Sequence, residues 1–211
     1  MTRPYRLGKR AVAASSTRQR LIEAATTLIV TSGFSAVTMD DVADRAGVSR
    51  PTVYRIFGSK VGLLEAVAWN ALATSGLERV DAARNLPEPR EALASFLIEN
   101  CRMLDSAGAV LRAAVEAARH DPDLARVIDA TYYGRRVESL RHLASRLADA
   151  DMLRAGWVSD AVVDALMILT SVDTFEVLSQ RRGLDWQHVA ARLSQMATAF
   201  IADSSRQNSP S

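Results

Sequence analysis

Residues 38–60 contain two short helical segments separated by a glycine, and no other feature limits the fold of this chain as strongly. Gly47 allows the positive φ that ends the first helix, and Ala43 is small enough for a second helix to cross closely. Val53, six residues after Gly47, can pack back onto the first helix. These spacings predict a helix-turn-helix.

Capping residues indicate where both helices begin. Thr38 can cap the first helix, with Asp41 three residues later in an aspartate form of the capping box. Ser49 can cap the second helix, and Pro51 falls in its first turn, where its missing N–H is not needed.

The second helix has a basic and aromatic outer face. At 100° per residue, Val53, Ile56 and Phe57 share the inner side. The outer and flanking positions hold Arg50, Pro51, Thr52, Tyr54 and Arg55. Arginine offers a donor fork that matches guanine in the major groove, and hydroxyl groups reach phosphates. The pattern predicts a DNA-reading helix, the alternative being a solvated amphipathic helix.

These residues resemble the TetR family of one-component transcriptional regulators. The resemblance covers roughly residues 15–65, about a quarter of the chain, and is most specific in the spacing of Tyr54, Phe57, Ser59 and Lys60. The chain departs from the family pattern at Val61-Gly62, where acidic residues are common. Glycine there is expected to loosen the start of the fourth helix by up to about 1 kcal/mol relative to alanine.

The resemblance implies an all-α fold of about nine helices, with an N-terminal three-helix DNA-binding domain and a larger helical domain for ligand binding and dimerisation. We expect a basic flexible arm over residues 1–14, the DNA-binding domain over 15–60, the larger domain over 61–203 and a disordered tail over 204–211. A merely solubilising arm is the alternative to one that follows DNA.

Charge is divided unevenly along the chain. Residues 1–60 carry a net charge of +6, and the remaining residues carry −4. This division predicts a polyanion partner for the N-terminal part. It also argues against an architectural protein that binds DNA without sequence preference, since such a protein would carry positive charge over most of its surface.

Each DNA-facing residue has an expected role. Arg50 and Arg55 are predicted to discriminate bases, with Pro51 and Thr52 shaping the contact. We expect phosphates to be held by Thr38, Tyr54 and Lys60. The expected partner is a palindromic double-stranded operator, and the expected action is repression, with activation as the alternative.

The rest of the chain has helical periodicity, with helices predicted over 92–104, 109–118, 122–151, 160–181 and from 186 onward. Two recognition helices must reach successive major grooves about 34 Å apart, which calls for a dimer. The resemblance implies that the last two helices form the dimer interface, although they could instead complete the monomer core. The candidate interface residues are Val163, Met167, Thr170, Trp186, Val189, Leu193, Met196 and Phe200.

The resemblance also implies a cavity for a small effector among the middle helices. The large side chains that could line it are Trp69, Met103, Leu111, Tyr132, Tyr133, Trp157 and Met167. Their mostly apolar character favours a hydrophobic or aromatic effector, although each of them alone is more often a core residue.

An enzyme is the rival class of protein. The three histidines, His120, His142 and His188, are scattered, and no motif for a metal, a cofactor or a catalytic nucleophile occurs. The single cysteine, Cys101, lies in an apolar helical stretch and is expected to be buried and inert. No secretory or membrane-spanning run is found, so a cytoplasmic location without membrane contact is expected.

Overall fold

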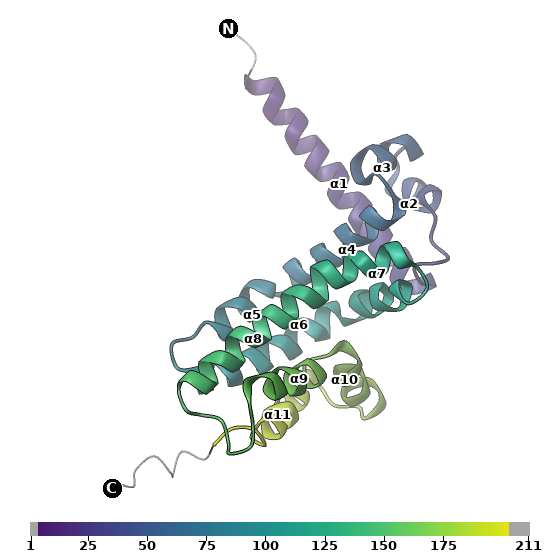
Figure 1. The fold of residues 1–211 in the computed structure, drawn as a ribbon. Coiled ribbons are helices and arrows are strands. Elements are labelled where there is room, and N and C mark those ends of the chain that lie inside the picture. The colour runs from purple at the N-terminus through teal and green to yellow at the C-terminus, as the bar shows by residue number, and fades with distance from the viewer. Residues whose placement is uncertain (1–3, 203–211) are drawn as a thin grey trace, which may run out of the picture. The chain divides into compact units, whose positions relative to one another are not determined.

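The computed structural model describes residues 4–202, which are almost entirely helical (Figure 1). The elements in chain order are α1 (Pro4–Ser32), α2 (Met39–Ala46), α3 (Arg50–Phe57), α4 (Lys60–Ser75), α5 (Leu77–Arg84), α6 (Pro89–Ala118), α7 (Pro122–Ile128), the π-helical turn η1 (Asp129–Tyr133), α8 (Gly134–Asp149), α9 (Ser159–Leu169), α10 (Val172–Glu176), the π-helical turn η2 (Val177–Arg181) and α11 (Trp186–Ala197). Extended pairing within the described residues is limited to one bridge between Leu153 and Ile201. The predicted all-α fold is confirmed, with slightly more helices than expected.

The chain divides into two compact units. Unit 1 contains the residues up to Ala71 together with Ala109–Ile128, and unit 2 contains Leu72–Gly108 and the residues from Asp129 onward. Unit 1 is therefore larger than the DNA-binding domain predicted over 15–60, because α4 and a later helical segment belong to it. This division places the helix-turn-helix within unit 1.

The first helix begins earlier than the sequence suggested. The predicted flexible arm over residues 1–14 is helical from Pro4 onward, and α1 runs without interruption to Ser32. Alanine is the best helix former, and the run from Ala11 to Ala14 carries the helix upstream of the apolar stripe. Residues 1–3 and the predicted tail over 204–211 lie outside the described residues.

Gly108 does not separate two helices, which corrects the prediction of a break between residues 104 and 109. α6 continues through it from Pro89 to Ala118. Glycine within a helix costs about 1 kcal/mol relative to alanine. The buried neighbours Ala107 and Leu111 hold the helix together across this position.

The predicted helix over 160–181 is interrupted. α9 ends at Leu169, and Ser171 caps α10 by accepting a hydrogen bond from the Thr174 N–H at 3.1 Å. The Thr170 N–H, at 2.9 Å, and the Thr170 hydroxyl, at 2.7 Å, both donate to the Leu166 carbonyl, and side-chain bonds of this kind often bend a helix. At the other end Val158 holds the N-cap position, and Ser159 is the first helical residue.

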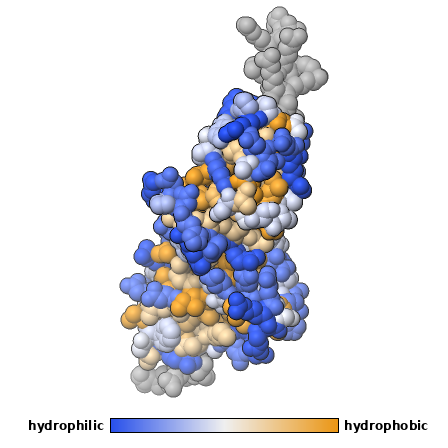
Figure 2. All heavy atoms as spheres, turned by 90° about the vertical axis from the view of Figure 1, so that its right-hand side faces the viewer, coloured by the Kyte–Doolittle hydropathy of each residue, from blue (hydrophilic) through white to orange (hydrophobic). Residues whose placement is uncertain are grey.

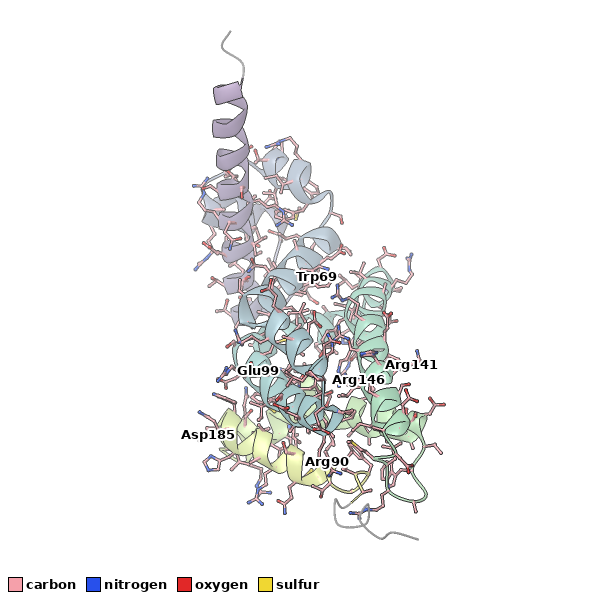
Figure 3. All side chains as sticks on the ribbon, turned by 90° about the vertical axis from the view of Figure 1, so that its left-hand side faces the viewer. Trp69, Arg90, Glu99, Arg141, Arg146 and Asp185 are labelled. Carbon is pink, nitrogen blue, oxygen red and sulfur yellow. The ribbon has the colours of Figure 1, made fainter. Side chains whose placement is uncertain are left out.

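Arg146 ties α8 to the loop after α5, as its orientation in Figure 3 shows. Its guanidinium donates to the carbonyl of Arg84 at 2.6 Å, to that of Leu86 and to that of Pro87 at 2.9 Å. The last carbonyls of a helix lack partners within the helix, so this arginine satisfies groups at the end of α5. The contacts fix one edge of unit 2.

Two sequence expectations concern buried and membrane-spanning segments. Cys101 is fully buried, as predicted, and burial raises the pKa of its thiol to about 12. A thiol with that pKa carries almost no thiolate at neutral pH. Among the described residues, no helix has both the length and the apolar character that crossing a membrane requires.

Candidate nucleic-acid interface

The turn between α2 and α3 has the geometry that its sequence predicts. Gly47 adopts φ 65°, and its N–H is directed to the carbonyls of Ala43 and Asp44 at the end of α2. An L side chain is strained in this left-handed conformation, so glycine suits the position. The expected helix-turn-helix is therefore present.

Thr38 and Asp41 form the predicted capping box. The Thr38 hydroxyl accepts from the Asp41 N–H at 3.1 Å and donates to Asp41 Oδ2 at 2.6 Å, and the same carboxylate oxygen accepts from the Thr38 N–H at 2.9 Å. Thr38 is exposed, so it remains a candidate phosphate contact, but its hydroxyl already serves the helix start.

Replacing Thr38 by alanine should lower the free energy of unfolding by about 1 kcal/mol, the usual cost of losing a threonine cap. The hydrogen bond from the Thr38 side chain, and then that from its backbone, lowers the pKa of Asp41. A lowered carboxyl pKa contributes stability at neutral pH that is lost as the pH falls through the folded-state value. Denaturant titrations should therefore show a difference between wild type and Thr38→Ala that shrinks in acid. A Thr38→Ser variant should keep the cap, and equal losses in both variants would contradict the assignment.

The recognition helix α3 buries one side and exposes the other. Val53 is fully buried, whereas Ile56 and Phe57 are half-buried. Of the residues predicted to contact DNA from α3, Arg50, Pro51, Tyr54 and Arg55 are exposed and Thr52 is half-buried. Ser49 holds the N-cap position of α3, but its hydroxyl makes no hydrogen bond to the backbone of the helix. The Ser49 hydroxyl lies instead 3.0 Å from the Thr52 hydroxyl.

Arg50 is held in place by its neighbours. Its guanidinium lies 3.1 Å from Asp40 Oδ2 and 3.5 Å from the Tyr54 hydroxyl, and it sits over the Tyr54 ring at 5.5 Å. The hydrogen bond to Tyr54, and then the charge of Asp40, raises the pKa of Arg50. Both members of the ion pair are more than half exposed, so the pair is weak and DNA can displace it. Sequence reasoning missed Asp40, although its charge, opposite to that of Arg50 across the turn, was a signal.

Arg55 differs from Arg50 because the structure gives it no salt bridge or side-chain hydrogen bond with another described residue. It lies exposed in the last turn of α3. Its donor fork is thus available to a base edge without first breaking a contact within the protein.

Lys60 and Arg18 connect the helix-turn-helix to its surroundings in unit 1. Lys60 Nζ donates to the Ser35 carbonyl at 3.3 Å and lies 4.4 Å from the centre of the Phe34 ring. Partial burial lowers the pKa of Lys60. The Arg18 guanidinium lies 5.5 Å from the centre of the Phe57 ring, which joins α1 to the end of α3. The predicted phosphate contact of Lys60 therefore comes from a side chain that also packs within the unit.

Gly62 is required by close packing at the start of α4, which reverses the expectation that it weakens this helix. A Cβ at this position would lie 2.3 Å from the Phe57 carbonyl oxygen, closer than any real contact. We expect Gly62→Ala to lower the free energy of unfolding by about 1–3 kcal/mol, the usual range for overpacking, as measured by denaturant titration. Helix propensity alone predicts a gain.

Gly108 offers the matched control, because a Cβ there meets nothing within 4 Å and the residue lies inside α6. Gly108→Ala should raise the free energy of unfolding by roughly 0.5–1 kcal/mol. If Gly62→Ala gave the same gain, the proposed clash with the Phe57 carbonyl would be ruled out.

The comparisons with known proteins agree with this geometry. The model of the family described as "Bacterial regulatory proteins, tetR family" matches residues 21–67, which run from α1 through the helix-turn-helix into α4. This segment of the chain matches the TetR family. The expectation drawn from the sequence is confirmed.

Two curated relatives match part of the chain. The HTH-type transcriptional regulator SrpR of Pseudomonas putida is 46% identical over 59 residues, 28% of each chain. The HTH-type transcriptional repressor BdcR of Escherichia coli is 32% identical over 119 residues, 54% of this chain and 59% of BdcR. The chain thus spans between about a quarter and three fifths of the length of these relatives.

The fold likeness extends further along the chain. The crystal structure of NalD, the secondary repressor of the MexAB-OprM multidrug efflux pump in Pseudomonas aeruginosa, has a TM-score of 0.68 and 20% sequence identity. The match covers 90% of this chain and 98% of NalD. At this identity the likeness concerns the fold alone, and it extends over both units.

The residues predicted to line an effector cavity are divided between the two units. Trp69 and Leu111 belong to unit 1, whereas the other five belong to unit 2. Trp157 packs against Phe200, with ring centres 5.4 Å apart. The remaining four are Met103, Tyr132, Tyr133 and Met167. Tyr132 and Tyr133 meet edge to face at 5.2 Å, and a neighbour of Tyr132, Arg136, contacts the Met167 carbonyl.

A groove of about 500 Å³ lies beside α8 in unit 2. Its lining residues are Arg84, Asn85, Arg135, Glu138, Ser139 and His142. All six are polar or charged, so this groove does not suit the hydrophobic effector that the sequence favoured.

Most of the predicted interface residues are buried in a single protomer. Val163, Thr170, Val189, Leu193 and Phe200 belong to its own core. Among the predicted residues only Met167, Trp186 and Met196 keep exposed surface. Helical periodicity identifies an apolar stripe but does not show what covers it. At these five positions the side chains complete the core of the protomer, as the alternative interpretation of the sequence had it.

Proposed function

We propose that this chain is a sequence-specific DNA-binding transcriptional repressor that acts as a homodimer on a palindromic operator and releases it when a small molecule binds to unit 2. The observation that carries the proposal is the outer face of α3, where Pro51, Tyr54 and Arg55 are exposed on the second helix of a helix-turn-helix. Repression is favoured over activation because BdcR and NalD are both named repressors.

Contacts from α3 support sequence-specific recognition. Arg55 provides an unengaged donor fork, and Arg50 becomes available once its exposed pair with Asp40 opens. A bidentate arginine–guanine contact discriminates against a wrong base by about 1–3 kcal/mol. Tyr54 and Thr38 offer hydroxyl groups near the same surface, suited to phosphate oxygens.

Two rows of exposed residues on α9 and α11 support dimerisation. Spaced four residues apart, the row on α9 consists of Asp160, Asp164 and Ile168, and that on α11 of His188, Arg192 and Met196. Ile168 is 67% exposed and Met196 51% exposed, unusual fractions for large apolar side chains. Figure 2 shows apolar side chains at the surface in its lower part, which holds α9 to α11 in Figure 1.

Charge makes these two rows complementary. The α9 row carries two aspartates and ends in an isoleucine, and the α11 row carries Arg192, together with a histidine paired to Asp185, and ends in a methionine. A two-fold interface places the same surfaces of both protomers together, so the α9 row of one chain can meet the α11 row of the other. We therefore assign the dimer interface to these exposed rows instead of the buried stripe.

Release by an effector requires that the ligand binds more tightly to a dimer in which the distance between the two α3 helices does not match the operator. The coupling equals the difference in ligand affinity between the two arrangements, typically 1–3 kcal/mol. Such a difference corresponds to a 5- to 150-fold change in operator affinity.

Selection of bound fragments from random duplex DNA, followed by affinity measurements at two salt concentrations, tests the proposal. We expect a short palindromic motif bound at least 1000-fold more tightly than random duplex at physiological salt. Enrichment of no motif would contradict sequence-specific recognition, and a motif without two-fold symmetry would contradict the dimeric arrangement.

A further inference from the structure

Arg136 occupies a core position of α8. Together with Leu140, Leu143 and Leu147 it follows the helical spacing of four, three and four, and these three leucines are fully buried. The residue as a whole is half-buried, but its Nε atom is buried and has no hydrogen-bond partner within the described part of the chain. Sequence reasoning missed it, although an arginine on an apolar stripe is a recognisable signal.

The groups around Arg136 are neutral. Its Nη2 donates to the Met167 carbonyl and, at 2.8 Å, to the Thr170 hydroxyl. Asn100, also buried, donates to the Thr170 carbonyl at 3.4 Å. Across the described residues, no carboxylate forms a salt bridge with Arg136. A buried cation faced only by dipoles is incompletely compensated, and natural proteins seldom retain one without a counter-ion.

Burial lowers the pKa of Arg136, with the neighbouring tyrosines acting in the opposite direction. Arginine nevertheless remains charged in proteins. Burial also raises the pKa of Tyr132, so this phenol stays a neutral donor at physiological pH. Two polar groups that can both donate hydrogen bonds thus lie together, with the Arg136 guanidinium 5.9 Å from the centre of the Tyr132 ring.

Two methionines and irregular helix geometry lie on the elements that contribute to this site. Met103 follows Asn100 by one helical turn on α6. Met167 lies on α9, and its own carbonyl accepts the hydrogen bond from Arg136. The π-helical turn η1 includes Tyr132, and α9 ends at Thr170. Turns of this kind occur frequently at functional sites. Methionine side chains adapt readily to a bound apolar group.

We propose that Arg136 binds the acidic group of the effector, so that the effector is a carboxylate carried on an apolar body. This inference rests on the proposed function and refines the class of its ligand. A carboxylate oxygen would accept a hydrogen bond from the unpartnered Nε–H, and its charge would compensate the guanidinium. The apolar body would contact Met103, Met167 and the face of Tyr132. A neutral apolar molecule would leave the cation uncompensated.

Matched pairs of probes test the assignment in the full chain. Octanoate, decanoate, benzoate and phenylacetate are each compared with the corresponding alcohol by isothermal titration and by the shift of Tm, which a ligand that binds only the folded state must raise. At least one acid should bind 10-fold or more tightly than its alcohol. If no acid bound, or if alcohols bound as tightly, the assignment would be overturned.

Variants locate the binding site. Arg136→Met should weaken binding of the acid at least 10-fold while changing binding of the alcohol less than 3-fold. Arg141→Met removes the same charge from an exposed position on α8, labelled in Figure 3, and should leave acid binding unchanged. Arg136→Lys, which keeps the charge but lacks the planar fork, should give an intermediate loss and remains informative if the methionine variant does not fold. Equal acid binding by wild type and Arg136→Met would refute the site.

A second readout separates this inference from the proposed function. Without ligand, the affinity of Arg136→Met for the selected duplex should be within 3-fold of the wild-type affinity. When the acid is added, the wild type and Arg141→Met should release the duplex, and Arg136→Met should keep it. If no chain prefers a duplex, the proposed function fails, and the calorimetric comparison still decides whether Arg136 binds the acid. If duplex binding is specific but acid affinity does not depend on Arg136, this inference alone fails.

Discussion

Replacing Ile168 by aspartate should convert the dimer to a monomer at micromolar concentration and weaken binding to the palindromic operator at least 100-fold. Ile168 is 67% exposed at the end of the acidic row on α9, so the protomer does not need it for its own core. In the assembled dimer the new carboxylate would lie in an apolar contact beside two further acids. Linked binding of two half-sites adds 10²–10⁴ in affinity over one, and this gain disappears with the dimer.

Ile98→Asp makes the same chemical change at an apolar residue that is 42% exposed on α6, outside the two rows. Sedimentation velocity should find this control dimeric and Ile168→Asp monomeric, with circular dichroism showing equal helix content in both. A dimeric Ile168→Asp variant would remove α9 from the interface.

Replacing Arg55 by alanine should lower affinity for the selected operator roughly 10- to 100-fold while changing affinity for random duplex by less than about 5-fold. The exposed guanidinium has no partner among the described residues, so its deletion leaves no buried group unsatisfied. A base contact is lost at one position of each half-site, and discrimination should relax there alone. Competition binding against single-base variants of the operator measures both effects.

Arg141→Ala removes the same charge from unit 2 and should change neither affinity. For contrast, Arg50→Ala should have a smaller effect than Arg55→Ala, because Arg50 must first leave Asp40 and Tyr54. Equal losses on all sequences for Arg55→Ala would assign it to the phosphate backbone rather than to a base.

Local patterns in the sequence were sufficient to predict the helix-turn-helix. The capping box of Thr38 and Asp41, the left-handed Gly47 and the buried Val53 all follow from rules that act over a few residues. The cap of α11 by Asp185, which accepts from the His188 N–H at 2.9 Å, is local in the same way.

Features that depend on distant neighbours could not be predicted in this way. Gly62 looked unfavourable until the Phe57 carbonyl was placed beside it, and the break between α9 and α10 at Thr170 and Ser171 does not interrupt the apolar pattern of the sequence. The apolar stripe of α11 was assigned to a partner chain, although Val189 and Leu193 pack inside one protomer. Composition along a helix reveals which face is apolar, and only tertiary structure shows what covers that face.

The number of chains bound to one operator duplex tests the central claim most directly. Native mass spectrometry of the full chain with the selected duplex should show two chains per duplex, and shortening the spacing between half-sites by five base pairs should abolish the complex, because the two recognition helices must then enter opposite faces of DNA. Two results would contradict a dimer that holds its two recognition helices at a fixed separation. One is a stable complex with a single chain per duplex, and the other is a complex that still forms when the half-site spacing is shortened.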